Sequence, residues 1–295
     1  MHCHGSANLE LAIPGFIEPV KDDVTRNAKN IGTDVHTVVE PFHDMPLPDL
    51  LMYGRVIMQY QALHITKRRV ITDTEQNLVK WFHDIGQAWD VKLVDWMMLV
   101  GQGGFTPKMM RFIFEVSNAV AAINARLKKR NLGSNQRQAI SVGEVTLVCD
   151  WLPSAPKTTP DVVWVGDGVL EICDYKSGAI KVSPVDNDQL LFYAASAWNN
   201  WDDFIGRPRE IVLHVMQPGN IDSWSCSFEY LQEWMARAVA ADNAIQAKDL
   251  RLRPSDHCTF CPANPHTRGD KGNVFCRPML DLLYPPVVDE DEIFA

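Results

Sequence analysis

The sequence predicts a mixed α/β protein that carries a helical insertion. Two observations support this fold class. Segments rich in Val, separated by turns that contain Pro or Gly, follow one another between residues 139 and 228. Apolar residues at three- and four-residue spacing instead run through residues 47–132, which is the pattern of amphipathic helices. We therefore expect a helical region to precede a core of strands and helices.

Taken in order, residues 1–31 lack a regular pattern, and Gly32, Thr33 and Asp34 then supply capping residues for a helix that begins near His36. Helical spacing covers residues 52–63, 78–89 and 109–127, with a break at 101–104. The remaining elements are expected to be strands at 140–151, 161–165, 169–176, 210–217 and 224–228, and helices at 185–201 and 229–247. The predicted domains are residues 1–45, 46–135, 136–250 and 251–295.

Length and composition agree with a globular protein and exclude a disordered chain. The 295 residues are 46% hydrophobic and 22% charged. No apolar stretch approaches the roughly 20 residues that span a bilayer, and the start of the chain lacks a secretory pattern, so we expect no membrane contact and a cytoplasmic location. The net charge of −9, from 28 basic and 37 acidic residues, argues against a surface coated with basic charge. A local basic groove remains open.

The most informative stretch is residues 160–176, which is predicted to be one hairpin. If Asp167 and Gly168 form a two-residue turn, Asp161 lies opposite Asp174 on the paired strand. Such neighbours hold their Cβ atoms about 4.5–5.5 Å apart, where like charges repel. Two close carboxylates suit a hard divalent cation, Mg²⁺ or Mn²⁺, with Lys176 as a positive neighbour. Alternatively, Asp174 and Lys176 form an ordinary ion pair, or a three-residue turn shifts the register.

The motifs resemble those of the PD-(D/E)XK nuclease superfamily, and in particular its RecB/AddB-like branch, which includes CRISPR-associated iron–sulfur exonucleases and phage exonucleases. The resemblance extends over four motifs in the order of that branch: Gly32 to His36, Pro160-Asp161, Asp174-Tyr175-Lys176, and Gln189 with Tyr193. It implies a restriction-endonuclease-like core, namely a mixed central sheet flanked by helices. It also implies a C-terminal metal-binding region that contains cysteines.

The resemblance also implies roles for these residues. The expected ligands of one or two divalent cations are His36, Asp161, Asp174 and the backbone carbonyl of Tyr175. Lys176 is expected to orient or activate the attacking water, and Gln189 and Tyr193 to brace the lysine and the scissile strand. Glu144 is similar to an acidic residue often found on the preceding strand of such nucleases. The alternatives are an ordinary helical pair of His36 with Glu40, and a core-packing role for Tyr193.

Three cysteines gather near the C-terminus, where Cys258 and Cys261 have C-x₂-C spacing and Cys276 follows. In a reducing cytoplasm such a group indicates metal rather than disulfides. The resemblance implies that Cys3 completes the set and that a [4Fe–4S] cluster staples the two ends of the chain. Structural zinc is the alternative, since His2, His4 and other histidines lie nearby in sequence. The other three cysteines, Cys149, Cys173 and Cys226, are expected to be core residues.

Basic residues concentrate at 126–130, at Arg137 and at 67–69, where a nucleic-acid backbone is one expected partner and solvated helix ends are the alternative. The acidic tail at 288–295 suggests a docking peptide for a protein partner, although solubility explains it equally well.

Together these features predict a metal-dependent DNA exonuclease that acts on single strands or duplex ends in phage or bacterial recombination, repair or replication. The alternatives are a structure-specific endonuclease on the same core, and a catalytically silent nucleic-acid-binding module stapled by zinc.

Overall fold

The computed structural model describes part of the chain: residues 3, 7–16, 39, 107–131, 140–176, 178, 180–255, 258, 261–264 and 275–284. Several sequence predictions lie outside these residues. They are the helix near His36, the helices at 52–63 and 78–89, the basic residues at 67–69 and Arg137, and the acidic tail.

The chain divides into two compact units. One comprises Met1–Asp22, Asp150–Pro156 and Trp234–Ala295, and the other comprises Asp23–Cys149 and Lys157–Glu233. The first unit is thus assembled from three separate stretches of sequence. The second holds the central sheet and, with it, the hairpin at 160–176.

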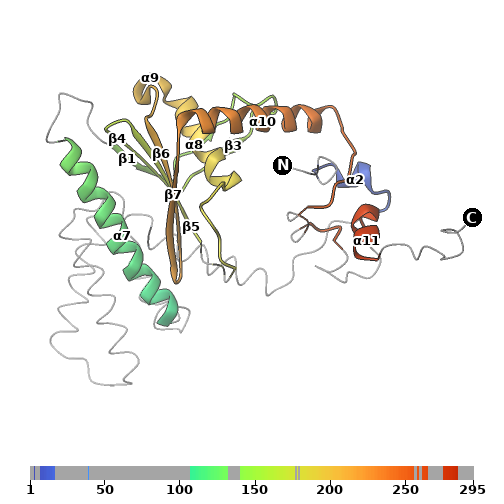
Figure 1. The fold of residues 1–295 in the computed structure, drawn as a ribbon, viewed down its shortest axis with the longest axis horizontal. Coiled ribbons are helices and arrows are strands. Elements are labelled where there is room, and N and C mark those ends of the chain that lie inside the picture. Colours follow the sequence, from blue (N-terminus) through green and yellow to red (C-terminus); the bar gives the residue numbers. More distant parts are fainter. Residues whose placement is uncertain are drawn as a thin grey trace, which may run out of the picture. The chain divides into compact units, whose positions relative to one another are not determined.

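The second unit is built on a five-stranded sheet (Figure 1). The strand order of this sheet is β1-β4-β5-β6-β7. Its strands are β1 (Ile140–Gly143), β4 (Val162–Gly166), β5 (Val169–Tyr175), β6 (Glu210–Gln217) and β7 (Asn220–Cys226). Neighbouring strands are antiparallel except β5 and β6, which are parallel. A parallel pair needs a crossover, and helices α8 (Asp188–Asn200) and α9 (Asp202–Ile205) provide it. Strands β2 (Leu147–Val148) and β3 (Lys157–Thr158) form a separate pair.

The hairpin of β4 and β5 has the register that the sequence predicts. Gly166 pairs with Val169 and Val162 pairs with Cys173. Asp167 and Gly168 adopt φ angles of 52° and 71°, as a two-residue turn of type I′ requires. The carboxylate of Asp167 accepts a hydrogen bond from Arg209 at 3.1 Å. The alternative of a three-residue turn is therefore excluded.

Helices cover both faces of this sheet. Helix α8 packs on the face of β5 that carries Asp174, because Gln189 of α8 contacts Asp174. Helix α7 (Pro107–Asn131) covers the opposite face, where Arg126 pairs with the buried Glu171 of β5. Strands β4 and β5 are buried along their whole length. This agrees with the continuous apolar sequence of β4, whereas in β5 the buried residues include Glu171 and Asp174. The structure thus confirms a mixed α/β fold with a mixed five-stranded sheet flanked by helices.

The first unit contains α2 (Leu9–Ala12), α11 (Arg277–Leu283) and most of α10 (Phe228–Gln246). The rings of Trp151 and Trp234 pack against each other with centroids 6.2 Å apart. A small apolar cluster joins the two ends of the chain, with Ile13 from the N-terminal segment against Cys261, Ala263 and Cys276. This cluster brings the predicted cysteine region next to residues 9–16.

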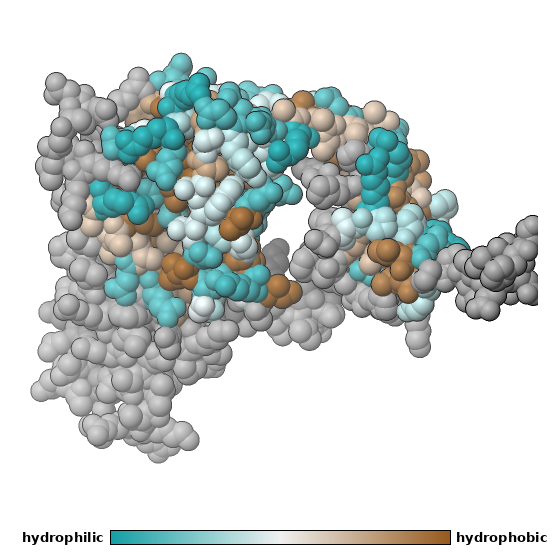
Figure 2. Space-filling view, viewed as in Figure 1, coloured by the Kyte–Doolittle hydropathy of each residue, from teal (hydrophilic) through white to brown (hydrophobic). Residues whose placement is uncertain are grey.

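On the face drawn in Figure 2, hydrophilic residues cover most of the described surface and apolar residues occur in separate patches. Exposed large apolar side chains include Ile180, Val185 and Ile221. No helix in the described part of the chain is both long and apolar enough to cross a membrane.

Several predicted boundaries are wrong, each for a local reason. The strand expected at 140–151 is broken at Glu144, whose φ of 48° ends the extended conformation after β1. The helix expected from residue 185 begins at Asp188, because the side chain of Asn187 caps it. The strand expected at 224–228 spans Asn220–Cys226, since Gly219 at φ 75° makes the turn from β6. Short elements α2, β3, α9 and α11 were not predicted.

Candidate functional site

Two buried carboxylates lie at one end of the β4–β5 hairpin. Asp174 is 4% exposed and belongs to β5, while Asp161 is 7% exposed and directly precedes β4. The register of the hairpin, continued by one residue, sets Asp161 opposite Asp174, as the sequence predicts. The carboxylate of Asp161 accepts a hydrogen bond of 2.5 Å from the backbone N–H of Tyr175. Adjacent buried strands thus fix both carboxylates.

Lys176 follows β5 and extends its pairing, because its N–H donates to the carbonyl of Met216 at 2.9 Å. Its ammonium lies 2.7 Å from Asp174 Oδ2 and donates to Gln189 Oε1 at 2.8 Å. Nε2 of Gln189 in turn donates to the Tyr193 hydroxyl at 2.6 Å and lies 3.3 Å from Asp174 Oδ1. Residues 189 and 193 are one helical turn apart on α8, so the helix presents both to the end of β5.

The proximity of the two carboxylates affects the pKa of Asp161. Burial first, and then the charge of Asp174, raise the pKa of Asp161 from 3.8 to about 8. Glu144 raises this pKa further, while the Tyr175 N–H and Lys176 lower it. The pKa of the Tyr193 hydroxyl is also raised, mainly by burial. Because the ionised form of Asp161 is costly here, a positive charge added beside the pair would stabilise it.

The other residues predicted for this site are Glu144, Tyr175 and His36. The N–H of Glu144 donates to the carbonyl of Asp161 at 3.0 Å, so Glu144 lies beside the two aspartates. Unlike them, Glu144 is exposed to solvent. Tyr175 is buried in β5 and contributes its N–H to Asp161. His36 lies outside the described residues. The structure therefore brings together Asp161, Asp174, Lys176, Gln189, Tyr193 and Glu144.

The donor set suits a hard cation. Carboxylate oxygens are the protein ligands that Mg²⁺ and Mn²⁺ prefer, and Mg²⁺ commonly uses one or two carboxylates while waters and phosphate oxygens complete its shell. Within the described residues, no three His, Cys, Asp or Glu side chains are arranged closely enough to form a metal site by themselves. Asp161 and Asp174 would thus supply two carboxylates to such a cation and would not form a closed cage.

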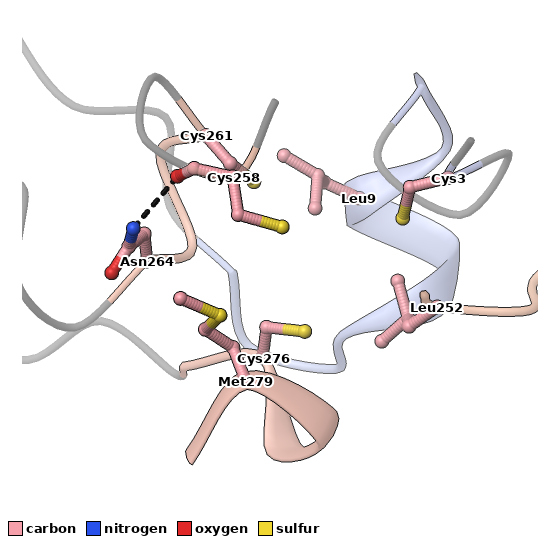
Figure 3. Close-up of a pocket in the computed structure, with 8 residues that line it drawn as sticks. All are labelled: Cys3, Leu9, Leu252, Cys258, Cys261, Asn264, Cys276 and Met279. Atoms are coloured by element: carbon pink, nitrogen blue, oxygen red, sulfur yellow. Dashed lines mark hydrogen bonds between the residues drawn. The ribbon is translucent and has the colours of Figure 1, made fainter. Parts of the chain in front are cut away.

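A second group of residues lines a pocket within the first unit (Figure 3). Cys3, Cys258, Cys261 and Cys276 all contribute, together with Leu9, Leu252, Asn264 and Met279. In Figure 3 the sulfur atoms of Cys258 and Cys276 point toward the middle of the pocket, and that of Cys3 lies across from them, over the ribbon of α2. The four cysteines that the sequence groups together, from opposite ends of the chain, therefore share one pocket.

Backbone groups are directed at two of these sulfur atoms. The N–H of Arg253 donates to Cys3 Sγ at 3.4 Å, and the N–H of Ser255 donates to Cys258 Sγ at 3.3 Å. The Asn264 amide donates to the Cys258 carbonyl at 2.7 Å and holds that segment. Burial raises the pKa of the Cys261 and Cys276 thiols, and neighbouring cysteines raise it further. Soft sulfur donors that receive N–H bonds are the donor set of zinc and of iron–sulfur sites.

Other polar contacts were missed by sequence reasoning. Glu171 is fully buried, and its carboxylate forms an ion pair with Arg126. His214 Nε2 lies 2.9 Å from Glu171 Oε2. Arg126 therefore faces a carboxylate rather than the phosphate backbone considered for the basic residues at 126–130. Gln217 is 2% exposed and bonds the segment that follows Lys176. A pattern that alternates in polarity would have placed Glu171 in solvent, and nothing around Gln217 in the sequence distinguishes it.

Comparison with known proteins gives a family and little more. No curated protein sequence matches the chain. Among solved structures, the chain is similar to that titled "Crystal structure of SSO0001", with 10% identity over 57% of this chain and 79% of that chain, and a TM-score of 0.27. A likeness this weak supports no conclusion on fold or function. The family described as "Protein of unknown function (DUF2800)" matches residues 1–295, and the chain therefore belongs to the DUF2800 family.

Proposed function

We propose that this protein is a metal-dependent DNA nuclease with a RecB-like core of the PD-(D/E)XK type. The observation that carries the proposal is the convergence of Asp161, Asp174 and Lys176 at one end of the β4–β5 hairpin, with Gln189 of α8 bonded to the lysine. A structural ion pair needs one carboxylate and one lysine. It does not need a second buried carboxylate whose ionisation is opposed by the first.

Each residue has a defined task in phosphodiester hydrolysis. Asp161 and Asp174 hold the divalent cation, with His36 and the Tyr175 carbonyl as further ligands by resemblance. When bound, the cation supplies a water of lowered pKa and positive charge that stabilises the developing phosphorane. Lys176, held between Asp174 and Gln189, orients the attacking water and faces the phosphate. Tyr193 fixes the amide of Gln189.

We further propose that the enzyme is an exonuclease that acts on single strands or duplex ends during DNA recombination, repair or replication. A structure-specific endonuclease on the same core has the same residues and differs only in its products. The silent binding module is the less favoured alternative, because binding alone does not require the costly juxtaposition of Asp161 and Asp174.

The test measures acid-soluble nucleotide released from linear single-stranded, linear duplex and closed circular DNA, with Mg²⁺, Mn²⁺ or chelator. We expect metal-dependent degradation of linear DNA only. Asp174→Ala and Lys176→Ala should each lower the rate about 100-fold or more. Asp188→Ala and Lys181→Ala are matched controls, since both residues are exposed and lie just beyond the site, and they should retain native rates.

Each other outcome assigns a different function. Nicking or linearisation of the closed circle, abolished by the same two substitutions, would establish the endonuclease. Equal inactivity of native and substituted proteins on every substrate and metal would refute the nuclease and leave the binding module.

We also propose that the four cysteines of the pocket hold a [4Fe–4S] cluster, with zinc as the alternative. The support is their shared pocket and the N–H groups directed at Cys3 and Cys258. Among the described residues no three of the four sulfur atoms are grouped closely enough to form a metal site as they stand, so the cluster requires the cysteines to draw together. Protein purified without oxygen should contain iron and inorganic sulfide in equal amounts and show visible absorbance that bleaches on reduction. Cys258→Ser should abolish both, whereas Cys226→Ser, in β7, should not. A colourless native protein with bound zinc would favour zinc, and one with neither metal would refute a metal site.

A further inference from the structure

The side chain of Gln217 is buried at the end of β6, although glutamine is a residue usually found at the surface. Its amide uses both N–H donors and accepts one hydrogen bond at its oxygen. Nε2 donates to the carbonyls of Gly178 at 2.7 Å and Ile180 at 2.6 Å, and Oε1 accepts from the N–H of Val182 at 3.0 Å. One buried amide thus replaces water for three backbone groups of a single segment.

This segment joins the two elements that carry the proposed nuclease site. It runs from Lys176 at the end of β5 to Asn187 at the N-cap of α8, and Gly178 and residues 180–187 of it are described. Its other end is tied as well, because Asn187 Nδ2 donates to the Ser183 carbonyl at 2.9 Å. This segment thus links Lys176 to the helix that carries Gln189, in addition to the packing of α8 on β5.

The free-energy cost of an unpaired buried amide means that Gln217 favours one conformation of the segment. A surface segment can leave its backbone groups in water at no cost, whereas a buried amide that loses its partners costs about 1–3 kcal/mol. Gln217 is therefore satisfied only when the segment adopts one conformation. In that conformation Lys176 Nζ lies 2.8 Å from Gln189 Oε1.

We infer that Gln217 is a positioning residue of the proposed nuclease: it fixes the segment between β5 and α8 so that Gln189 meets and orients Lys176. The inference rests on the proposed function. Gln217 acts through the contact of Lys176 with Gln189, while the hairpin sets the backbone positions of Asp161 and Asp174.

The experiment is a double-substitution cycle measured with linear DNA and Mn²⁺. Gln217→Met keeps the length of the side chain, fills its space and removes all three bonds. We expect kcat to fall about 10- to 100-fold, with KM and the Mn²⁺ affinity from calorimetry unchanged, because Asp161 and Asp174 are undisturbed. In the Gln189→Ala background the contact is already absent, so Gln217→Met should cause little further loss of kcat.

Leu213→Val is the matched control, since Leu213 is fully buried in the same strand and has no bond to the segment. It should lower the melting temperature without the fall in kcat. The inference would be overturned if Gln217→Met lowered kcat by the same factor in the native and Gln189→Ala backgrounds. It would also be overturned if Leu213→Val, at the same melting temperature as Gln217→Met, showed the same fall in kcat. A native kcat in Gln217→Met overturns the inference alone, whereas a native protein without nuclease activity refutes the proposed function and the inference with it.

Discussion

At the scale of single residues, Asp161 shows most clearly what the site costs. Its pKa rises from 3.8 to about 8, because burial and the neighbouring Asp174 both oppose its ionisation. Between these two values the folded protein binds more protons than the unfolded chain. The free energy of unfolding that this group contributes therefore falls as pH rises from about 4 to about 8. In chelator, the ionised pair weakens the fold that holds it.

Asp161→Asn should therefore stabilise the protein in chelator at about pH 8 and above, and have little effect near pH 4. The amide is neutral at every pH and its oxygen still accepts from the Tyr175 N–H. The measurement is the melting temperature of native and substituted protein across this range. Saturating Mn²⁺ should reverse the order at high pH, because only the native carboxylate pair gains the ion.

A difference between the two proteins that does not change with pH would contradict the raised pKa. Asp222→Asn is a suitable control for a general charge effect, since Asp222 is exposed in β7.

At the scale of elements, the β4–β5 hairpin depends on its turn. Gly168 has a φ of 71°, where a side chain is strained, and an added Cβ would meet no atom closer than 3.7 Å. The cost of substitution is thus conformational and not steric. Gly168→Ala should lower the free energy of unfolding by about 1–2 kcal/mol, measured by urea denaturation.

Gly178→Ala is the control, because Gly178 has no neighbour within 4 Å of an added Cβ and does not adopt a left-handed φ. It should not lower the free energy of unfolding. If Gly168→Ala had native stability, the turn would tolerate another geometry. The turn could then not be what determines the register that places Asp161 opposite Asp174.

Elements whose cause is local could be predicted from the sequence. The Asp167-Gly168 dipeptide specifies its own turn and hence the register, and the limits of β6 follow from its apolar run ended by Pro218 and Gly219. Contacts distant in sequence could not be predicted. Nothing about the residue Glu144 signals a positive φ, and the burial of Gln217 depends on a segment about 39 residues away.

For the candidate site the same division holds. Asp161, Asp174 and Lys176 could be named because a hairpin fixes their spacing. Gln189 and Tyr193 were named from the resemblance, and their four-residue spacing placed them on one face of a helix. That α8 covers the face of β5 with Asp174, and α7 the face with Glu171, is decided by tertiary packing.

At the scale of the whole molecule, the two units are built from the sequence in different ways. The sheet unit has its strands within residues 140–226, and its hairpins pair neighbours in the chain. The other unit joins residues 3–16 to residues 252–279 in one pocket and one apolar cluster. Only the family resemblance suggested this closure, by adding Cys3 to the C-terminal cysteines, since no local pattern links positions about 250 residues apart.

This closure imposes an order on synthesis. A ribosome releases the strands β1 to β7 well before Cys276, so the sheet unit has its full complement of strands while Cys3 still waits for its partners. Closing so long a loop is also entropically slow. The N-terminal segment is consequently the first part of the pocket to be made and among the last to be buried. Throughout elongation the Cys3 thiol lacks the C-terminal residues that line the pocket with it, so the pocket can form only after residue 279 has left the ribosome.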